Sequence, residues 1–357
     1  MRSAFPTTKS AAAFGLLLLI VLLLPILVGK AWLPPREEIY ATPSLVVGNF
    51  SYIKKQIYIE KVDLDIAFVG SSHIGYGIYT PYVQAELSKR LGRNTTVASL
   101  AWYGAGFDSV YFITKDLLAN RKVHLLVITD EYNPRWPIPH MAAPRWFLFG
   151  DDWADLMGLP LVYKAGYYAA ALRGIPRNIL SVARPNLPMI PHSWDKATER
   201  LGAFDVPLGF GPEDKEVKGA DFVEYTPTNK NSLSDVCVYS SVTKDQFAFS
   251  GLHTPTAQFF FLKKLVALAQ TNGVKLVWLH SPKVSELRAP AVPERECWPK
   301  MFPGAVTLMG IPPKDFLAGI SDTNVLKLFC NDSHLNNNGQ KYFTRAITPT
   351  LLKLYAP

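Results

Sequence analysis

The 357 residues are 48% hydrophobic and only 18% charged, against about 25% charged in average soluble domains, and the formal net charge is +8. The basic residues are scattered and no zinc-finger or RNA-binding motif occurs, which excludes the common nucleic-acid-binding classes. The positive charge instead fits a solvated surface, a membrane surface or an anionic polymer.

The N-terminal segment is uncharged between Lys9 and Lys30 and is long enough to cross a bilayer as a helix. A cleaved signal peptide is the alternative, but no small-residue cleavage site follows. We therefore predict a cytoplasmic tail and signal anchor over residues 1–33, with 11–29 in the bilayer, and a linker over 34–62. The positive charges before the anchor predict a single-pass protein of the bacterial inner membrane whose remainder is periplasmic or extracellular.

From residue 63 to 357 the pattern is that of an α/β domain. Helical periodicity predicts four helices, which cover 80–92, 107–120, 255–273 and 336–355. Short apolar runs predict five strands, which cover 65–70, 95–100, 123–129, 274–280 and 305–310. This alternation predicts right-handed crossovers, a parallel sheet and a three-layer α/β/α sandwich.

The regular alternation stops between residues 134 and 251. This part of the chain is rich in proline, tryptophan, tyrosine and glycine, and its periodicity is fragmentary, as in 161–175. We interpret 134–251 as a large irregular insertion or a lid over the site.

A serine and a histidine lie at the ends of predicted elements, where catalytic residues are expected. The first predicted strand ends in "GSSH", which puts Ser72 at the carboxyl edge of the sheet, where open α/β sheets place their sites. His334 precedes the last predicted helix, and Asp332 lies two residues before it. A histidine can remove the serine proton while a carboxylate holds its ring, so the pattern predicts a Ser72–His334–Asp332 triad.

Four motifs in this order resemble the blocks of the SGNH (GDSL-like) hydrolases. They are "GSS", "SLAWYGAG", "ITDEYN" and "NDSHLN". The resemblance covers about 65–133 and 254–355, and it implies that Ser72 is the nucleophile. It also implies that an oxyanion is bound by the N–H groups of Ser72 and Gly104 and by the side chain of Asn133.

The sequence departs from the SGNH pattern at three places. Ser71 stands where the family has aspartate, and Asn331 stands where the last block has its aspartate. We favour Asp332 as the partner of His334, because a carboxylate stabilises imidazolium; the alternative is that Asn331 orients the ring. Asn133 falls one residue late and fits equally well as a turn residue before a proline.

Further residues near the motifs are weaker candidates for substrate contact. His73 follows the nucleophile, and Arg135 and Trp136 follow the third motif; ordinary packing is the alternative for each. The three cysteines match no metal spacing, and we expect Cys237 to pair with Cys297 and Cys330 to stay reduced. No nucleotide-binding or metalloprotease motif occurs, so we expect neither cofactor nor metal.

A single anchor followed by an SGNH-like domain resembles the accessory acyltransferases of the alginate and DltD-like kind. The resemblance implies transfer of an acyl group, acetyl above all, to an exported polysaccharide beside a multi-pass membrane O-acyltransferase. An anchored esterase or deacetylase is the first alternative. A catalytically degenerate module that binds polymer or scaffolds a membrane complex is the second.

Overall fold

A computed structural model of the chain describes residues 7–32, 35–40, 50–101, 106–129, 138–140, 142–183, 257–282, 305–310, 328–329 and 334–356. The chain divides into two compact units. The first unit combines Met1–Val46 with Met141–Ile190, and the second combines Val47–His140 with Pro191–Pro357.

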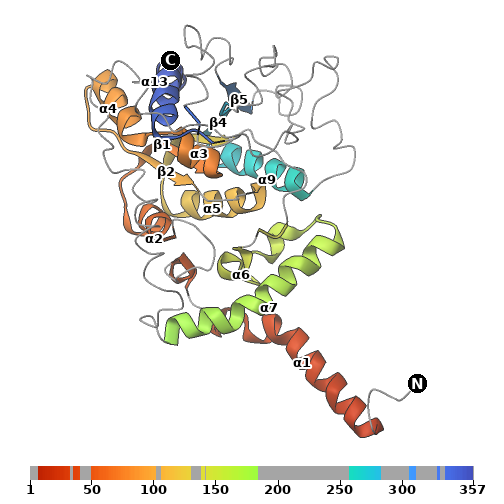
Figure 1. Cartoon of the computed structure of the whole chain (residues 1–357). Helices are drawn as coiled ribbons and strands as arrows, with labels where there is room; N and C mark the ends of the chain where they lie inside the picture. Colours follow the sequence, from red (N-terminus) through yellow and green to blue (C-terminus); the bar gives the residue numbers. More distant parts are fainter. Residues whose placement is uncertain are drawn as a thin grey trace, which may run out of the picture. The chain divides into compact units, whose positions relative to one another are not determined.

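A five-stranded parallel sheet forms the centre of the second unit (Figure 1). Its strands are β1 (Leu64–Gly70), β2 (Val97–Ala101), β3 (Val123–Thr129), β4 (Lys275–Leu279) and β5 (Val306–Met309). Their spatial order is β2-β1-β3-β4-β5. Strand β1 is buried at every position, as expected for a central parallel strand. All five predicted strands are present, which confirms the α/β class.

The helices of the second unit form two packed groups. They are α2 (Phe50–Lys54), a π-helix η2 (Lys55–Ile59), α3 (Ser72–Gly77), α4 (Thr80–Leu91), α5 (Phe107–Asn120), α9 (Ala257–Thr271) and α13 (Asn337–Tyr355). Helix α5 packs against α9, whereas α13 packs against α3 and α4 (Figure 1). The four predicted long helices are therefore confirmed, and α2 and η2 lie inside the range that we interpret as a linker.

The first unit consists of helices only, in the part of it that the structure describes. They are α1 (Thr8–Trp32), η1 (Arg36–Tyr40), α6 (Ala143–Trp146), η3 (Trp153–Leu156) and α7 (Leu161–Ala183). Large side chains such as Trp146, Phe147 and Tyr167 form its core. Arg36 forms an ion pair with the buried Asp152. The range interpreted as an irregular insertion thus contains a helix of 23 residues, α7.

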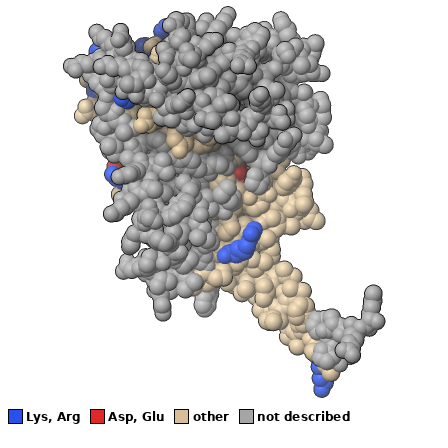
Figure 2. All heavy atoms as spheres, viewed as in Figure 1, with Lys and Arg blue, Asp and Glu red and all other residues tan. Residues whose placement is uncertain are grey.

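Helix α1 is long and apolar enough to cross a membrane. Within the candidate span Thr8–Val28, an 18-residue window has a mean hydropathy of 3.0, and only 6% of that window is buried. Figure 2 shows its surface without charged side chains along most of its length. By length and composition this helix could cross a membrane, as either an anchor or a signal sequence would.

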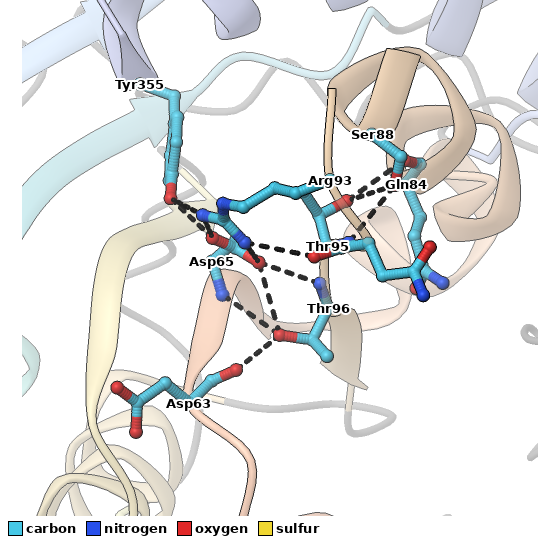
Figure 3. Close-up of polar contacts among 9 residues, drawn as sticks. Asp63, Asp65, Gln84, Ser88, Arg93, Thr95, Thr96 and Tyr355 are labelled. Atoms are coloured by element: carbon cyan, nitrogen blue, oxygen red, sulfur yellow. Dashed lines mark hydrogen bonds and ion pairs between the residues drawn. The ribbon is translucent and has the colours of Figure 1, made fainter. Parts of the chain in front are cut away.

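A polar cluster at the amino end of β1 fixes the far end of α13 (Figure 3). The buried carboxylate of Asp65 accepts hydrogen bonds from Arg93 Nη2 at 2.5 Å, Tyr355 Oη at 2.5 Å and the N–H of Thr96 at 2.8 Å. Burial alone would raise the pKa of Asp65, but the hydrogen bonds from Arg93, Tyr355 and Thr96 outweigh it and lower this pKa. The cluster joins the start of β1 to the last turn of α13.

We expect Asp65→Asn to lower the free energy of unfolding by about 1–3 kcal/mol at neutral pH, because Arg93 and Tyr355 lose a charged acceptor. The folded-state pKa of Asp65 lies below that of the unfolded chain. The stabilisation is therefore complete above the ordinary carboxyl pKa and is lost as pH falls through the folded value. Urea denaturation followed by circular dichroism should show the same difference between the two proteins at about pH 7 and about pH 5, and a smaller difference at about pH 3. A constant difference from pH 7 down to about pH 3 would contradict the role given to the charge.

Candidate active site

Ser72 and His334 are brought together by the fold. The Oγ atom of Ser72 lies 2.7 Å from Nε2 of His334, although 262 residues separate them in the sequence. This is a normal length for a hydrogen bond that a hydroxyl donates. When the imidazole carries its proton on Nδ1, Nε2 accepts from the serine, which is the arrangement that a general base requires. Both residues are half-buried, so the pair stays accessible.

The sheet topology explains where this pair lies. From β1 the chain passes to β2 on one side and then to β3 on the other, so the strand order reverses between β1 and β3. Open α/β sheets bind their ligands beyond the carboxyl ends of the strands at such a reversal. Ser72 lies two residues beyond Gly70, the last residue of β1, at the position predicted from its sequence context.

The turn from β1 into α3 depends on Gly70 and Ser71. A Cβ atom at Gly70 would lie 2.6 Å from Cγ1 of Ile74, so only glycine fits between the strand and the helix. Ser71 is the N-cap of α3, and its Oγ accepts a hydrogen bond from the N–H of His73 at 3.2 Å. Serine and aspartate are comparable N-cap residues, so Ser71 can supply the capping that an aspartate would give there.

The backbone N–H of Ser72 has no hydrogen-bond acceptor among the residues that the structure describes. It belongs to the first turn of α3, where N–H groups lack partners inside the helix. A donor beside the reacting Oγ is suited to bind the oxyanion of a tetrahedral intermediate. This position agrees with the role that the sequence resemblance implies for Ser72.

The ring of His334 contacts two other rings. His73 stacks on it with a centroid distance of 4.8 Å and an interplanar angle of 25°. Tyr76 meets it edge-on at 5.2 Å and 64°. Both contacts come from α3, the helix that carries Ser72, and His73 is buried. His73, for which substrate contact and packing were the two interpretations, packs on the candidate base.

Helix α13 holds the segment after His334 against α3. Gln340 Nε2 donates to the carbonyls of Gly75 and Ile78, each at 3.0 Å. The Thr344 hydroxyl donates to the Gly77 carbonyl at 3.2 Å and accepts from the N–H of Tyr79 at 2.9 Å. These carbonyls belong to the C-terminal end of a short helix and lack intrahelical partners. The side chains of α13 supply those partners and thereby fix α3.

The start of α13 is itself tightly placed. Asn336 is its N-cap, and its Oδ1 accepts from the N–H groups of Asn338 and Gly339, each at 3.0 Å. A Cβ at Gly339 would lie 2.1 Å from the Leu328 carbonyl oxygen, so glycine is required for the close approach. His334 therefore leads into a helix whose first turn cannot shift freely.

Several predicted site residues lie outside the described residues. They are Gly104, Asn133, Arg135, Trp136, Asn331, Asp332 and the three cysteines Cys237, Cys297 and Cys330. In the part of the chain that the structure describes, no cluster of three or more side chains could hold a metal ion. Sequence reasoning missed Tyr76, Gln340 and Thr344. The i, i+4 spacing of two polar residues on the buried face of α13 was the available signal for the last two.

A cavity of about 420 Å³ lies away from this site. Leu64, Thr96, Val97 and Arg121 are among the residues that line it. The first three stand at the amino ends of β1 and β2, the edge of the sheet opposite Ser72. The cavity therefore has no part in the chemistry of Ser72 and His334.

Gln340→Leu removes the donor to the α3 carbonyls while keeping the side-chain volume similar. We expect labelling of Ser72 by a fluorophosphonate to slow by about 10- to 100-fold, because a displacement of α13 misplaces His334. Gln270→Leu, at an exposed position of α9, is the matched control and should react normally. Equal labelling of both variants, with unchanged circular dichroism, would show that Gln340 does not position the base.

The stacking of His73 on His334 predicts that two substitutions of His73 slow the labelling of Ser72 to different degrees. His73→Ala removes the stacked ring and should slow fluorophosphonate labelling by about tenfold, whereas His73→Phe keeps a ring and should stay within about threefold of wild type. Labelling rates at saturating and subsaturating probe would separate reactivity from binding. Equal loss in both variants would point to a polar role for the imidazole instead.

A scan against protein-family models finds no match, and a search of curated proteins finds no similar sequence. The feature of the site that bears most directly on its chemistry is a serine hydroxyl hydrogen-bonded to a histidine at the carboxyl edge of a parallel sheet.

Proposed function

We propose that the second unit is a serine-dependent acyl-transfer domain that acts outside the cytoplasm on a cell-surface or exported polysaccharide. The observation that carries this proposal is the 2.7 Å contact between Ser72 Oγ and His334 Nε2. A serine hydroxyl is a weak nucleophile until a base within hydrogen-bonding distance removes its proton. The N–H of Ser72, which has no acceptor within the described part of the chain, supports the same chemistry, because it lies beside the position where the oxyanion would form.

In the first half of the reaction, the Ser72 proton passes to His334 Nε2 as Oγ forms a bond to the acyl carbon. The carbonyl oxygen becomes an oxyanion, which accepts a hydrogen bond from the N–H of Ser72. The tetrahedral intermediate then collapses, and the leaving group takes the proton from His334. The product is an acyl ester on Ser72.

In the second half, His334 removes a proton from an acceptor hydroxyl, which attacks the acyl ester. Collapse of the second intermediate returns the proton to Ser72 and releases the acylated acceptor. A sugar hydroxyl as acceptor makes the protein a transferase, and water makes it an esterase. The same side chains serve both reactions.

The finer assignments belong to the same proposal and rest on the SGNH resemblance. Gly104 and Asn133 complete the oxyanion site, and Asp332 holds His334. The domain is a three-layer α/β/α sandwich interrupted by an insertion at 134–251. This is supported by the strand order, since right-handed crossovers on either side of β1 put helices on both faces of the sheet.

The apolar surface of α1 supports the proposed location. The chain is a single-pass protein of the bacterial inner membrane, and its catalytic unit faces the periplasm. In this position it receives acyl groups from a multi-pass membrane O-acyltransferase.

The test compares wild type with Ser72→Ala and His334→Ala in the full chain, solubilised in detergent. We expect both variants to lose acetate release from a chromogenic acetyl ester, and wild type alone to react with a fluorophosphonate. The fall should be about 1000-fold or more, because serine and histidine act as one unit. His124→Ala, at an exposed position of β3, is the matched control.

Acetyl release that persists in Ser72→Ala would refute the assignment of the nucleophile. A folded wild-type protein that neither hydrolyses the ester nor reacts with the fluorophosphonate would support the non-catalytic module instead. Adding an oligosaccharide acceptor distinguishes a transferase from an esterase, since a transferase forms an acetylated sugar faster than it releases acetate.

A further inference from the structure

Helix α7 exposes one face and buries the other. Its buried face includes Tyr167, Ala170 and Gly174, and a Cβ at Gly174 would lie 2.0 Å from the Pro144 carbonyl oxygen of α6. The exposed positions recur at intervals of three or four residues and are Leu161, Val162, Ala165, Ala169, Arg173, Pro176 and Ile179. This spacing is that of one side of an α-helix.

The exposed face of α7 is unusually apolar. Leu161 is 80% exposed and Val162 is 72% exposed, while Met157, just before the helix, is 62% exposed. Helix α7 contains Lys164, Arg173 and Arg177 but no acidic residue. A water-facing helix surface normally carries charges of both signs. An apolar face with only basic charges is typical of a helix that lies in a membrane interface.

The contact between α7 and α1 indicates where the exposed face of α7 would lie relative to a bilayer. The two helices pack together in the first unit, and Figure 1 shows α7 meeting the end of α1 that is farther from the N-terminus. The candidate span of α1, Thr8–Val28, has 21 residues, which as a helix extend about 30 Å, the thickness of the hydrocarbon core. If α1 crosses the bilayer, its far end lies at the level of the lipid headgroups, and so does the helix that packs there.

The aromatic side chains of the first unit are consistent with a position of α7 at the level of the lipid headgroups. Phe149 packs on Trp153 at 4.9 Å and on Tyr168 at 5.4 Å, and Tyr168 belongs to α7. Tryptophan and tyrosine collect at the boundary between lipid and water, where one end of the ring is apolar and the other is wet.

We propose that α7 is a second membrane-binding element, which lies in the interface of the bilayer that α1 crosses. Leu161, Val162 and Met157 enter the boundary between headgroups and acyl chains, and Lys164 and Arg173 face the phosphates of anionic lipids. The proposal depends on α1 being a membrane helix and is independent of acyl transfer by Ser72.

The test uses the full chain in vesicles of phosphatidylcholine and phosphatidylglycerol. The photoreactive residue p-benzoylphenylalanine replaces Val162, and mass spectrometry identifies what it captures after illumination. Val62 is the matched control, because it is also a valine and is 62% exposed, but in the second unit. Leu18 of α1 serves as the positive control. We expect lipid adducts at position 162 with a yield close to that at 18, and only background at 62.

Background yield at 162 together with strong lipid capture at 18 would overturn the proposal. Capture of a protein instead of lipid at 162 would also overturn it, in favour of a protein-binding face. In vesicles of phosphatidylcholine alone we expect a lower yield at 162. An unchanged yield there would remove the role given to Lys164 and Arg173.

Discussion

The hydrogen bonds from α13 to the end of α3 are the constraint on which the candidate site depends. Gln340 and Thr344 bind three carbonyls at that end, and these carbonyls would otherwise lack partners. The opposite end of α13 is also fixed, because Tyr355 binds Asp65 and the Leu354 carbonyl accepts from Lys275 Nζ at 2.5 Å. Helix α13 thus runs from the carboxyl edge of the sheet to its amino edge and is anchored at both.

Because α13 is fixed at both ends, it can hold His334 in contact with Ser72 although the two are far apart in the sequence. The turn after β1 places Ser72 through the capping by Ser71, and α13 places His334 through its own capped first turn. The stacking of His73 adds a link between the two, since His73 belongs to α3, the helix of Ser72, and touches the ring of His334. The contact between Ser72 and His334 is therefore held from both of its elements, as a preorganised site would require.

The sequence predicts the parts of this arrangement that have local causes. Strands β1 and β3 follow from continuous apolar runs, and the place of Ser72 follows from the end of such a run. The partnership of Ser72 with His334 was predictable because both stand at strand or helix ends in a known chemical pattern. The tyrosine- and glycine-rich segment around 161–175, with Pro176 after it, gives little evidence of helix, and the 23-residue helix α7 was missed. Gln340 and Thr344 were missed because their partners are backbone carbonyls more than 260 residues away, which leave no mark on the local sequence.

The 262 residues between Ser72 and His334 also set the order in which the two are synthesised. Strand β1 and Ser72 leave the ribosome long before His334. Until α13 is made, the carbonyls at the end of α3 have only water to bind, and Ser72 lacks the imidazole that shares its hydrogen bond. The contact between Ser72 and His334 is therefore a late event in folding, which requires the last helix to pack on α3.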